Sequence, residues 1–235
     1  NNYKPYLTSF HKTADSFKQG SRTLPQRYYI EDLLLEEEME NIFFNRWLCI
    51  GRSNEIKKSG EYKIFTIGNE SLFIIRNENN QLMAFYNICR HRGTRICSKK
   101  NGKYSKSIQC PYHGWTYDLS GRLIGAPNMD AVEQFNKDNY PLFPADLIEW
   151  EGFIFINLSE NPSEFKLEYK PIINRFSEWE INDIEIYESK VYHVNCNWKL
   201  IIQNYSECYH CPMIHKSLRE ITSYLGGKND LVSGP

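Results

Sequence analysis

Two short cysteine–histidine stretches constrain this 235-residue chain more than any other feature. The first contains Cys89 and His91, the second contains Cys110 and His113, and 18 residues (92–109) separate them. One thiolate and one imidazole from each of two loops make a set of four metal ligands. Two centres accept this set: a tetrahedral zinc ion, or a [2Fe–2S] cluster with two cysteines on one iron and two histidines on the other.

Glycine and proline flank both stretches. Gly93 follows the first pair, and Pro111 and Gly114 accompany the second. These residues allow tight loops whose backbone N–H groups can approach bridging sulfides, where a Cβ would clash. The flanking residues therefore favour the iron–sulfur cluster over zinc or a fortuitous set of core side chains.

The two stretches resemble the ligand loops of the Rieske family, which read C-x-H-R-G and C-P-Y/W-H-G-W in its oxygenase branch. The resemblance implies a Rieske cluster with Cys89 and Cys110 on one iron and His91 and His113 on the other.

Rieske proteins of respiratory complexes have a further disulfide between these loops, but this chain has Thr94 and Tyr112 at the two positions. The nearby Cys97 therefore lacks a partner at Tyr112, and we expect it to be a small buried hydrophobic residue. This leaves the oxygenase or ferredoxin type of cluster.

The composition indicates a soluble, cytoplasmic protein with a real core. The chain is 41% hydrophobic with a net charge of −1, which gives no reason to expect a nucleic-acid or membrane partner. It has no run of 18 apolar residues and no N-terminal signal segment, and its seven cysteines are irregularly spaced, as reduced thiols and metal ligands are. The missing initial Met and the final Gly234-Pro235 are typical of a fragment.

Hydrophobic periodicity predicts a helix followed by a β domain. Residues 30–47 repeat apolar side chains near a helical period among acids that form a solvated face. Short strands separated by turns follow, in a small antiparallel barrel or sandwich with the ligand loops at the tips of hairpins. The expected strands are 48–50, 62–67, 72–75, 82–87, two within 116–123, two within 147–158 around Gly152, and 190–195.

A second group of donors lies in residues 197–215. Helix-forming residues dominate up to Cys211, and a helix places Glu207 and His210 on one face with Asn204. On these residues alone, an ordinary helix end without a metal is the alternative.

The spacing of the two histidines needs a break in this helix. His215 follows His210 by five residues and would point about 140° away from it on a straight helix. Pro212 breaks or ends the helix, so the chain can bring both imidazoles to one point. Two histidines and one carboxylate with open positions are the donors of non-haem Fe(II) oxygenases.

This run resembles the N-W-K…N-x-x-D/E-x-Y-H-x4-H signature of the catalytic domain in Rieske non-haem iron oxygenase α subunits. The resemblance implies that His210 and His215 hold a mononuclear Fe(II) and that Asn204 lies near it. Glu207 takes the place of the acid that bridges the iron-ligand histidine and a cluster histidine of the neighbouring subunit. Such an acid can fix the His210 tautomer and couple protonation to electron transfer.

The family's third iron ligand is a carboxylate that we expect beyond residue 235. Glu220 and Asp230 are acids without the matching context. The Glu-Cys-Tyr-His-Cys-Pro form at 207–212 looks like the branch of glycine betaine, choline and carnitine monooxygenases, and it favours a quaternary or methylated amine as the substrate.

The resemblance implies an α+β fold: an antiparallel β-barrel or sandwich with the Rieske cluster, then the start of an α+β catalytic domain of the helix-grip, START-like type. The expected segments are an N-terminal arm and helix at 1–45, the Rieske domain at 46–160, and the first part of the catalytic domain at 161–235.

The implied activity is that of a mono- or dioxygenase component that uses O2 to hydroxylate or N-demethylate a small organic substrate. No GxGxxG fingerprint follows a strand, so NAD(P)H electrons are expected through a separate flavin/iron–sulfur reductase or a ferredoxin. The family implies a homotrimer or an α3β3 assembly. The alternatives are an aromatic-ring-hydroxylating dioxygenase α subunit, and a Rieske electron carrier or inactive fragment.

Overall fold

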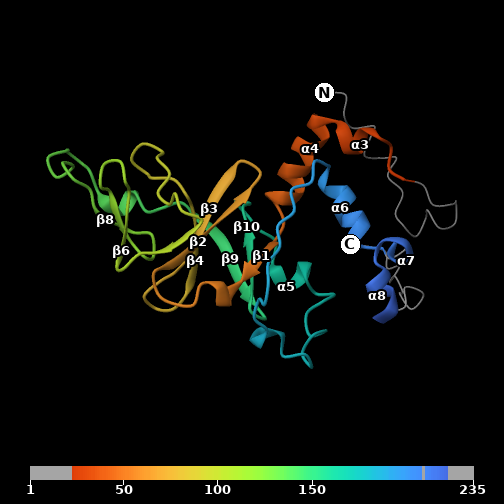
Figure 1. Cartoon of the computed structure of the whole chain (residues 1–235). Helices are drawn as coiled ribbons and strands as arrows, with labels where there is room; N and C mark the ends of the chain where they lie inside the picture. The colour runs from red at the N-terminus through yellow and green to blue at the C-terminus, as the bar shows by residue number, and fades with distance from the viewer. Residues whose placement is uncertain (1–22, 208–209, 222–235) are drawn as a thin grey trace. The chain divides into compact units, whose positions relative to one another are not determined.

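The structure is a computed structural model that describes residues 23–207 and 210–221. The chain divides into two compact units (Figure 1). One unit runs from Glu36 to Lys190, and the other combines the residues up to Leu35 with those from Val191 onward. The three segments expected from the sequence, 1–45, 46–160 and 161–235, stay a prediction.

The larger unit contains two antiparallel sheets (Figure 1). The first has the strand order β1-β10-β9-β4-β3-β2-β5, and the second has the order β6-β7-β8. The predicted antiparallel β domain is confirmed, and every strand predicted before residue 160 overlaps an observed one. The bounds are β1 Leu48–Arg52, β2 Glu61–Ile67, β3 Glu70–Arg76, β4 Leu82–Tyr86, β5 Asn101–Lys103, β6 Ser107–Gln109, β7 Thr116–Asp118, β8 Leu123–Gly125, β9 Pro144–Trp150 and β10 Phe153–Asn157.

Strand β3 separates two hydrophobic cores. Successive side chains of a strand point to opposite faces of its sheet. Phe73 and Ile75 pack into the core that also contains the cysteines of the two ligand loops. Leu72 and Ile74 pack on the other side with strand β10. All four side chains are 0% exposed. Strand β3 is therefore fully buried, and one of its faces contributes to the core that contains Cys89 and Cys110.

The hairpin expected around Gly152 is present, with β9 and β10 as its two strands. Trp150 pairs with Phe153, which leaves Glu151 and Gly152 as a two-residue loop. Their φ angles are +48° and +73°, as a type I′ turn requires. A Cβ on Gly152 would lie 2.6 Å from Nη2 of Arg52. That Nη2 donates hydrogen bonds to the carbonyl oxygens of residues 181, 182 and 184. The absence of a Cβ at Gly152 therefore leaves room for the Arg52 guanidinium, which attaches residues 181–184 to the sheet.

The helix predicted over residues 30–47 is present with different limits. It consists of α3 (Arg27–Ile30), α4 (Asp32–Glu38) and a π-helical turn, η1 (Met39–Phe43). Within the larger unit, Met39 and Phe43 pack against the second core. Short helical elements follow at η2 Ser53–Glu55, η3 Lys137–Asn139, α5 Phe165–Glu168 and η4 Ile181–Asp183. No helix among the described residues is both long and apolar enough to cross a membrane.

The strand predicted at residues 190–195 was wrong. These residues form no ladder with any other described residue. Val191, Tyr192 and Val194 are 68%, 79% and 57% exposed. Alternation of side chains is not sufficient for a strand, because a strand also needs a hydrogen-bonded neighbour. Among the described residues after 195, three helices follow: α6 Trp198–Tyr205, α7 Cys211–Ile214 and α8 Lys216–Ile221.

Candidate metal centres

The two cysteine–histidine loops have the same backbone geometry. In the first loop, the Cys89 N–H donates to the carbonyl of Thr94, and the Gly93 N–H donates to the carbonyl of Cys89. In the second, the same two bonds link Cys110 with Trp115 and Gly114 with Cys110. The four N···O distances lie between 2.8 and 3.1 Å. Each cysteine therefore begins a closed turn of equal length, within which the histidine is the third residue of the first loop and the fourth residue of the second.

Both turns end at a glycine in the left-handed region. The φ angles are +71° at Gly93 and +72° at Gly114. A Cβ would meet no protein atom closer than 3.7 Å at Gly93 or 3.6 Å at Gly114. Within the protein, glycine is therefore required by the backbone angle, since other residues rarely adopt it.

The loops are attached to the sheets in different ways. The second loop joins β6 to β7, whose residues Gln109 and Thr116 are paired, so it is the tip of a hairpin as predicted. The first loop joins β4 to β5, and the same prediction was wrong there. β4 pairs with β3 and β9, whereas β5 pairs with β2, so the first loop crosses between non-adjacent strands. Sequence spacing did not reveal this crossing.

The two candidate thiol ligands lie inside the first core. Cys89 and Cys110 are each 3% exposed. The hydroxyl oxygen of Tyr117 lies 3.4 Å from the Cys89 sulfur and accepts a hydrogen bond from the Arg90 N–H. Burial is the main cause that raises the pKa of the Cys89 thiol, and the neighbouring Cys110 thiol contributes. The two thiols therefore lie in the same apolar core.

The two candidate imidazole ligands lie side by side nearer the surface. The ring centroids of His91 and His113 are 4.7 Å apart, and the rings are nearly perpendicular. The His91 ring stacks on buried Trp115 at 4.9 Å, and the Tyr112 ring lies 3.8 Å from that of His113. Burial first, then the charges of His113 and Arg92, lower the pKa of His91. A lowered pKa favours the neutral imidazole, which is the form that binds a metal.

These four side chains fit a Rieske cluster in donor type and in grouping. In the part of the chain that the structure describes, no three His, Cys, Asp or Glu side chains are placed to hold one metal ion. The donors stand as one pair of thiols and one pair of imidazoles. That division is the one a Rieske cluster uses, with two cysteines on one iron and two histidines on the other.

Sequence reasoning missed Tyr117 as a neighbour of this site. Tyr117 is 0% exposed, and its hydroxyl reaches the first loop although its strand follows the second. The available signal was its position two residues after Trp115, because side chains two apart in an extended segment point to the same side. Cys97 was predicted correctly as a buried hydrophobic residue, because it is a free thiol that is 2% exposed.

The second group of predicted residues also contains a close pair. Nδ1 of His210 lies 2.6 Å from Oε1 of Glu207, and the His210 and His215 ring centroids are 5.2 Å apart. The side chains of His210 and Glu207 are 23% and 42% exposed. Asn204 lies earlier, in α6, with an exposed side chain. Of the two remaining acids, Glu220 is exposed in α8, and Asp230 lies outside the described residues.

The local structure around these residues differs from the prediction. A continuous helix was expected to Cys211, but α6 ends at Tyr205. Pro212 lies in the first turn of the next helix, α7, where a missing N–H breaks no hydrogen bond. His210 precedes α7 and His215 follows it. Pro212 thus begins a short helix between the imidazoles instead of ending a long one.

Known proteins match the chain over both groups of residues. Residues 46–136 match the Rieske [2Fe–2S] domain, and residues 181–229 match the catalytic domain of the ring-hydroxylating α subunit. The glycine betaine monooxygenase oxygenase subunit of Chromohalobacter salexigens is 34% identical over 216 residues, which cover 91% of this chain and 48% of that protein. The carnitine monooxygenase oxygenase subunit of Acinetobacter baumannii is 37% identical over 195 residues, which cover 82% of this chain and 52% of that protein.

A solved structure is similar over the same region. The crystal structure of the quaternary ammonium Rieske monooxygenase CntA with L-carnitine has a TM-score of 0.82 and 33% identity, and it covers 91% of this chain and 62% of that one. The predicted fold class, a Rieske domain followed by the start of an α+β catalytic domain, is confirmed. The chain spans about half the length of the relatives it matches.

Proposed function

Because this chain belongs to the family of Rieske oxygenase α subunits, we propose that it acts in a terminal oxygenase component that hydroxylates or N-demethylates a small methylated or quaternary amine. The observation that carries this proposal is the pair of matching loops, in which two buried thiols and two neighbouring imidazoles are held by the same backbone turns. A protein that only carries electrons would need the cluster site and no second group of metal ligands. The Glu207–His210 pair with His215 favours an oxygenase.

The cluster residues would have distinct tasks. Cys89 and Cys110 would hold one iron, and His91 and His113 the other. The apolar core shields the thiolates from water, while the stack on Trp115 fixes the plane of the His91 ring. The imidazoles lie nearer the surface, where the neighbouring subunit of the proposed assembly would receive the electron.

The residues of the second site would prepare a mononuclear Fe(II). A His210 Nδ1–H that donates to Glu207 leaves Nε2 unprotonated and available to the metal. His215 would be the second protein ligand, and Asn204 would lie nearby. When bound, the iron supplies O2 activation at its open positions. The third ligand that we propose is a carboxylate of the protein outside this sequence.

We further propose the partners that such a component needs. Electrons from NAD(P)H would arrive through a flavin/iron–sulfur reductase or a ferredoxin. The assembly would be a homotrimer or α3β3, in which Glu207 bridges His210 to a cluster histidine of the neighbouring subunit. Inter-subunit electron transfer has been described for the quaternary ammonium Rieske monooxygenase. Exposed free thiols at Cys49 and Cys196 suit a reducing compartment, and we propose the cytoplasm.

The metal content of the purified protein tests this proposal. We expect about three iron per two acid-labile sulfides, because a [2Fe–2S] cluster and one mononuclear iron are predicted. His210→Ala should lower the ratio to about two iron per two sulfides without changing the visible spectrum of the cluster. About two irons in both proteins would contradict the oxygenase and favour the electron carrier.

The substrate class needs its own measurement. With a reductase and NADH, trimethylated amines such as glycine betaine and carnitine should stimulate NADH oxidation and release formaldehyde. The control substrates are naphthalene and the corresponding primary amines. A stimulation by naphthalene and not by the methylated amines would favour the aromatic-ring-hydroxylating dioxygenase. Residues 181–229 match the catalytic domain of a ring-hydroxylating α subunit.

A further inference from the structure

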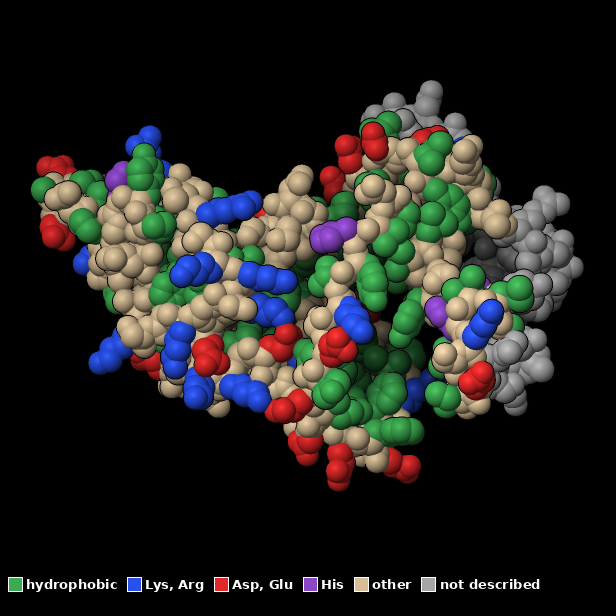
Figure 2. Space-filling model, in the orientation of Figure 1, with side chains coloured by type: hydrophobic (Ala, Val, Ile, Leu, Met, Phe, Trp, Pro, Cys, Tyr) green, Lys and Arg blue, Asp and Glu red, His purple; other side chains and the backbone are tan. Residues whose placement is uncertain are grey.

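The charge around the first ligand loop differs sharply from that of the whole chain. The chain has a net charge of −1, yet the segment 88–109 contains no Asp or Glu. Its seven basic residues are Arg90, Arg92, Arg95, Lys99, Lys100, Lys103 and Lys106. Figure 2 shows many Lys and Arg side chains gathered on one face of the larger unit. This concentration lies directly beside the predicted cluster ligands.

Six of these residues form what we call the basic patch: Arg92, Arg95, Lys99, Lys100, Lys103 and Lys106. All six are exposed, and none has an ion-pair partner within the described ranges. Arg90 is different, since its guanidinium donates to the carbonyls of Pro141 and Asn139 and lies 4.0 Å from the Phe143 ring centroid. Arg90 therefore serves the fold, whereas the patch carries charge that the unit itself leaves uncompensated.

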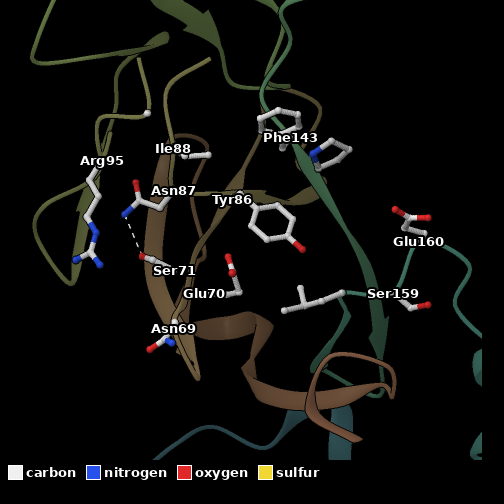
Figure 3. Close-up of a pocket in the computed structure, with 13 residues that line it drawn as sticks. Asn69, Glu70, Ser71, Tyr86, Asn87, Ile88, Arg95, Phe143, Ser159 and Glu160 are labelled. Carbon is white, nitrogen blue, oxygen red and sulfur yellow. Dashed lines mark hydrogen bonds between the residues drawn. The ribbon is translucent and has the colours of Figure 1, made fainter. Parts of the chain in front are cut away.

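The patch is continuous with the first ligand loop. Arg95 and Gly93 line one cavity, where Figure 3 shows Arg95 on the side away from Glu160. Arg95 also lines a second cavity of about 660 Å³, together with Lys63 and Lys100. Lys63 then lines a third hollow with Lys103. The basic surface thus extends from the loop of His91 to strand β5. The cavity that Arg95 and Lys100 share has no acidic side chain in its described lining, whereas Glu55 and Glu61 also line the hollow beside Lys103, and Lys63 is paired with Glu55.

We propose that the basic patch is the docking surface for an electron-donor protein with an acidic face. This inference rests on the proposed function, in which a separate protein delivers electrons to the cluster. One electron would leave the reduced donor and reduce the cluster. Surface charges of opposite sign raise the rate of encounter and orient the partner, and this patch begins on the loop that carries Cys89 and His91.

The composition of the patch favours a transient donor over a second copy of this chain. The buried centres of lasting interfaces are depleted in lysine and rich in aromatic residues. Four of the six patch residues are lysines, all of them exposed. Such a surface gives a salt-sensitive interaction that forms and dissociates quickly, as repeated electron delivery requires.

Binding of an acidic plant-type [2Fe–2S] ferredoxin tests the surface. We use the oxidised ferredoxin as the probe and measure its affinity for the loaded protein by titration calorimetry at several NaCl concentrations. The affinity should fall about tenfold or more between roughly 50 and 500 mM NaCl, because opposite charges are screened. Basic cytochrome c, a redox protein of similar size, should not bind.

The variant that breaks the patch is Arg95→Glu/Lys100→Glu, and its matched control is Lys166→Glu/Lys170→Glu. All four side chains are exposed in the same unit, and both variants change the charge equally. We expect the patch variant to lose about tenfold or more in ferredoxin affinity and in the rate of cluster reduction by reduced ferredoxin, because it reverses two charges in the docking surface. The control variant should keep the wild-type ferredoxin affinity and the wild-type rate of cluster reduction. The charge-conserving variant Arg95→Lys/Lys100→Arg should retain most of the ferredoxin binding.

Dithionite separates this proposal from the proposed function. This small reductant needs no docking surface, so it should reduce the cluster of both variants at the wild-type rate. Equal ferredoxin binding by the two variants, with an intact cluster, would overturn the docking surface alone. A change of oligomeric state in the patch variant only, with unchanged ferredoxin binding, would assign the patch to a second copy and also overturn it. A protein without a dithionite-reducible cluster would contradict the proposed function itself.

Discussion

The two candidate metal centres of this chain are built on different supports. The thiols of Cys89 and Cys110 are part of a hydrophobic core, and each begins a turn that backbone hydrogen bonds close. The imidazoles of His210 and His215 flank a four-residue helix whose backbone bonds involve both residues. The described contacts of the His210 ring are with the side chains of Glu207 and His215. The first centre therefore lies in a hydrophobic core, whereas the second lies on a short helix and its rings are held mainly by one another and by Glu207.

This difference affects what each substitution should do. A change of a cluster ligand removes a donor from a rigid site that cannot reorganise to replace it. A change beside His210 alters an exposed pair whose hydrogen bond competes with water. We therefore expect losses that are nearly complete at the first centre and graded at the second.

The largest effect is expected for Cys89→Ser. A serine hydroxyl does not replace a thiolate on iron, so the visible absorbance of the cluster should be almost absent. Cys97→Ser is the matched control, because Cys97 lies in the same core and is equally buried but is not a predicted ligand. The measurement is the visible and EPR spectrum, with iron and sulfide content. A normal spectrum of Cys89→Ser, or the loss of the cluster in Cys97→Ser alone, would contradict the ligand assignment.

A smaller effect is expected for Glu207→Gln at the second centre. The amide keeps the shape of the carboxylate but holds the His210 tautomer less strongly, and such a change beside a metal ligand costs about 10- to 100-fold in metal affinity. Iron titration of the metal-depleted protein measures it. Glu220→Gln is the control, since Glu220 is an exposed acid of α8. Cluster spectra should stay unchanged in both variants, and a loss of cluster in Glu207→Gln would contradict the independence of the two centres.

The same contrast explains how much the sequence could predict. The strands and the second ligand loop follow from alternation and from turn residues, which are local properties of the chain. The crossing of the first loop from β4 to β5 depends on the pairing of β5 with β2, a long-range contact that no local pattern contains. The helix over Asn204 and Glu207 was predicted too long, because local propensity did not reveal its end at Tyr205.

The candidate site residues show the same division between local patterns, which the sequence reveals, and long-range contacts, which it does not. Their motif spacing identified the six candidate ligands and Glu207, and their roles stay predictions. Tyr117 lay outside any motif, because its contact with Cys89 joins residues 28 positions apart. A contact of this kind arises from the packing of one sheet against a loop, which sequence spacing does not encode.

An intermediate effect is expected for Gly93→Ala and Gly114→Ala, which test whether the two loops are equivalent. At φ angles of +71° and +72° each alanine should lower the free energy of unfolding, by about 1–2 kcal/mol. Gly125→Ala is the control, since Gly125 has no positive φ and a Cβ there makes ordinary contacts. Urea unfolding measures all three. Clearly unequal losses at Gly93 and Gly114 would show that the loops differ in ways their backbone bonds do not reveal.

The smallest effect is expected for Tyr117→Phe, which sharpens the comparison inside the first centre. The Tyr117 oxygen already accepts the Arg90 N–H, so its own hydrogen is available to the Cys89 sulfur. A hydrogen bond to a thiolate ligand stabilises the more negative, reduced cluster. Its loss should lower the reduction potential, and about 1 kcal/mol for one hydrogen bond corresponds to about 40 mV for one electron.

A spectroelectrochemical titration measures this shift and does not depend on turnover. Tyr104→Phe is the matched control, because the Tyr104 hydroxyl lies 3.5 Å from the sulfur of Cys97, which is not a predicted ligand. The reduction potential of the cluster in Tyr104→Phe should equal that of the wild type. Equal shifts in the two variants would assign the effect to a general change in the core, whereas a shift in Tyr117→Phe alone would connect a side chain after the second loop to the electronic properties of the first. The two loops would then be coupled through Tyr117 as well as through a shared cluster, whereas the described ring contacts of His210 and His215 are with Glu207 and with each other.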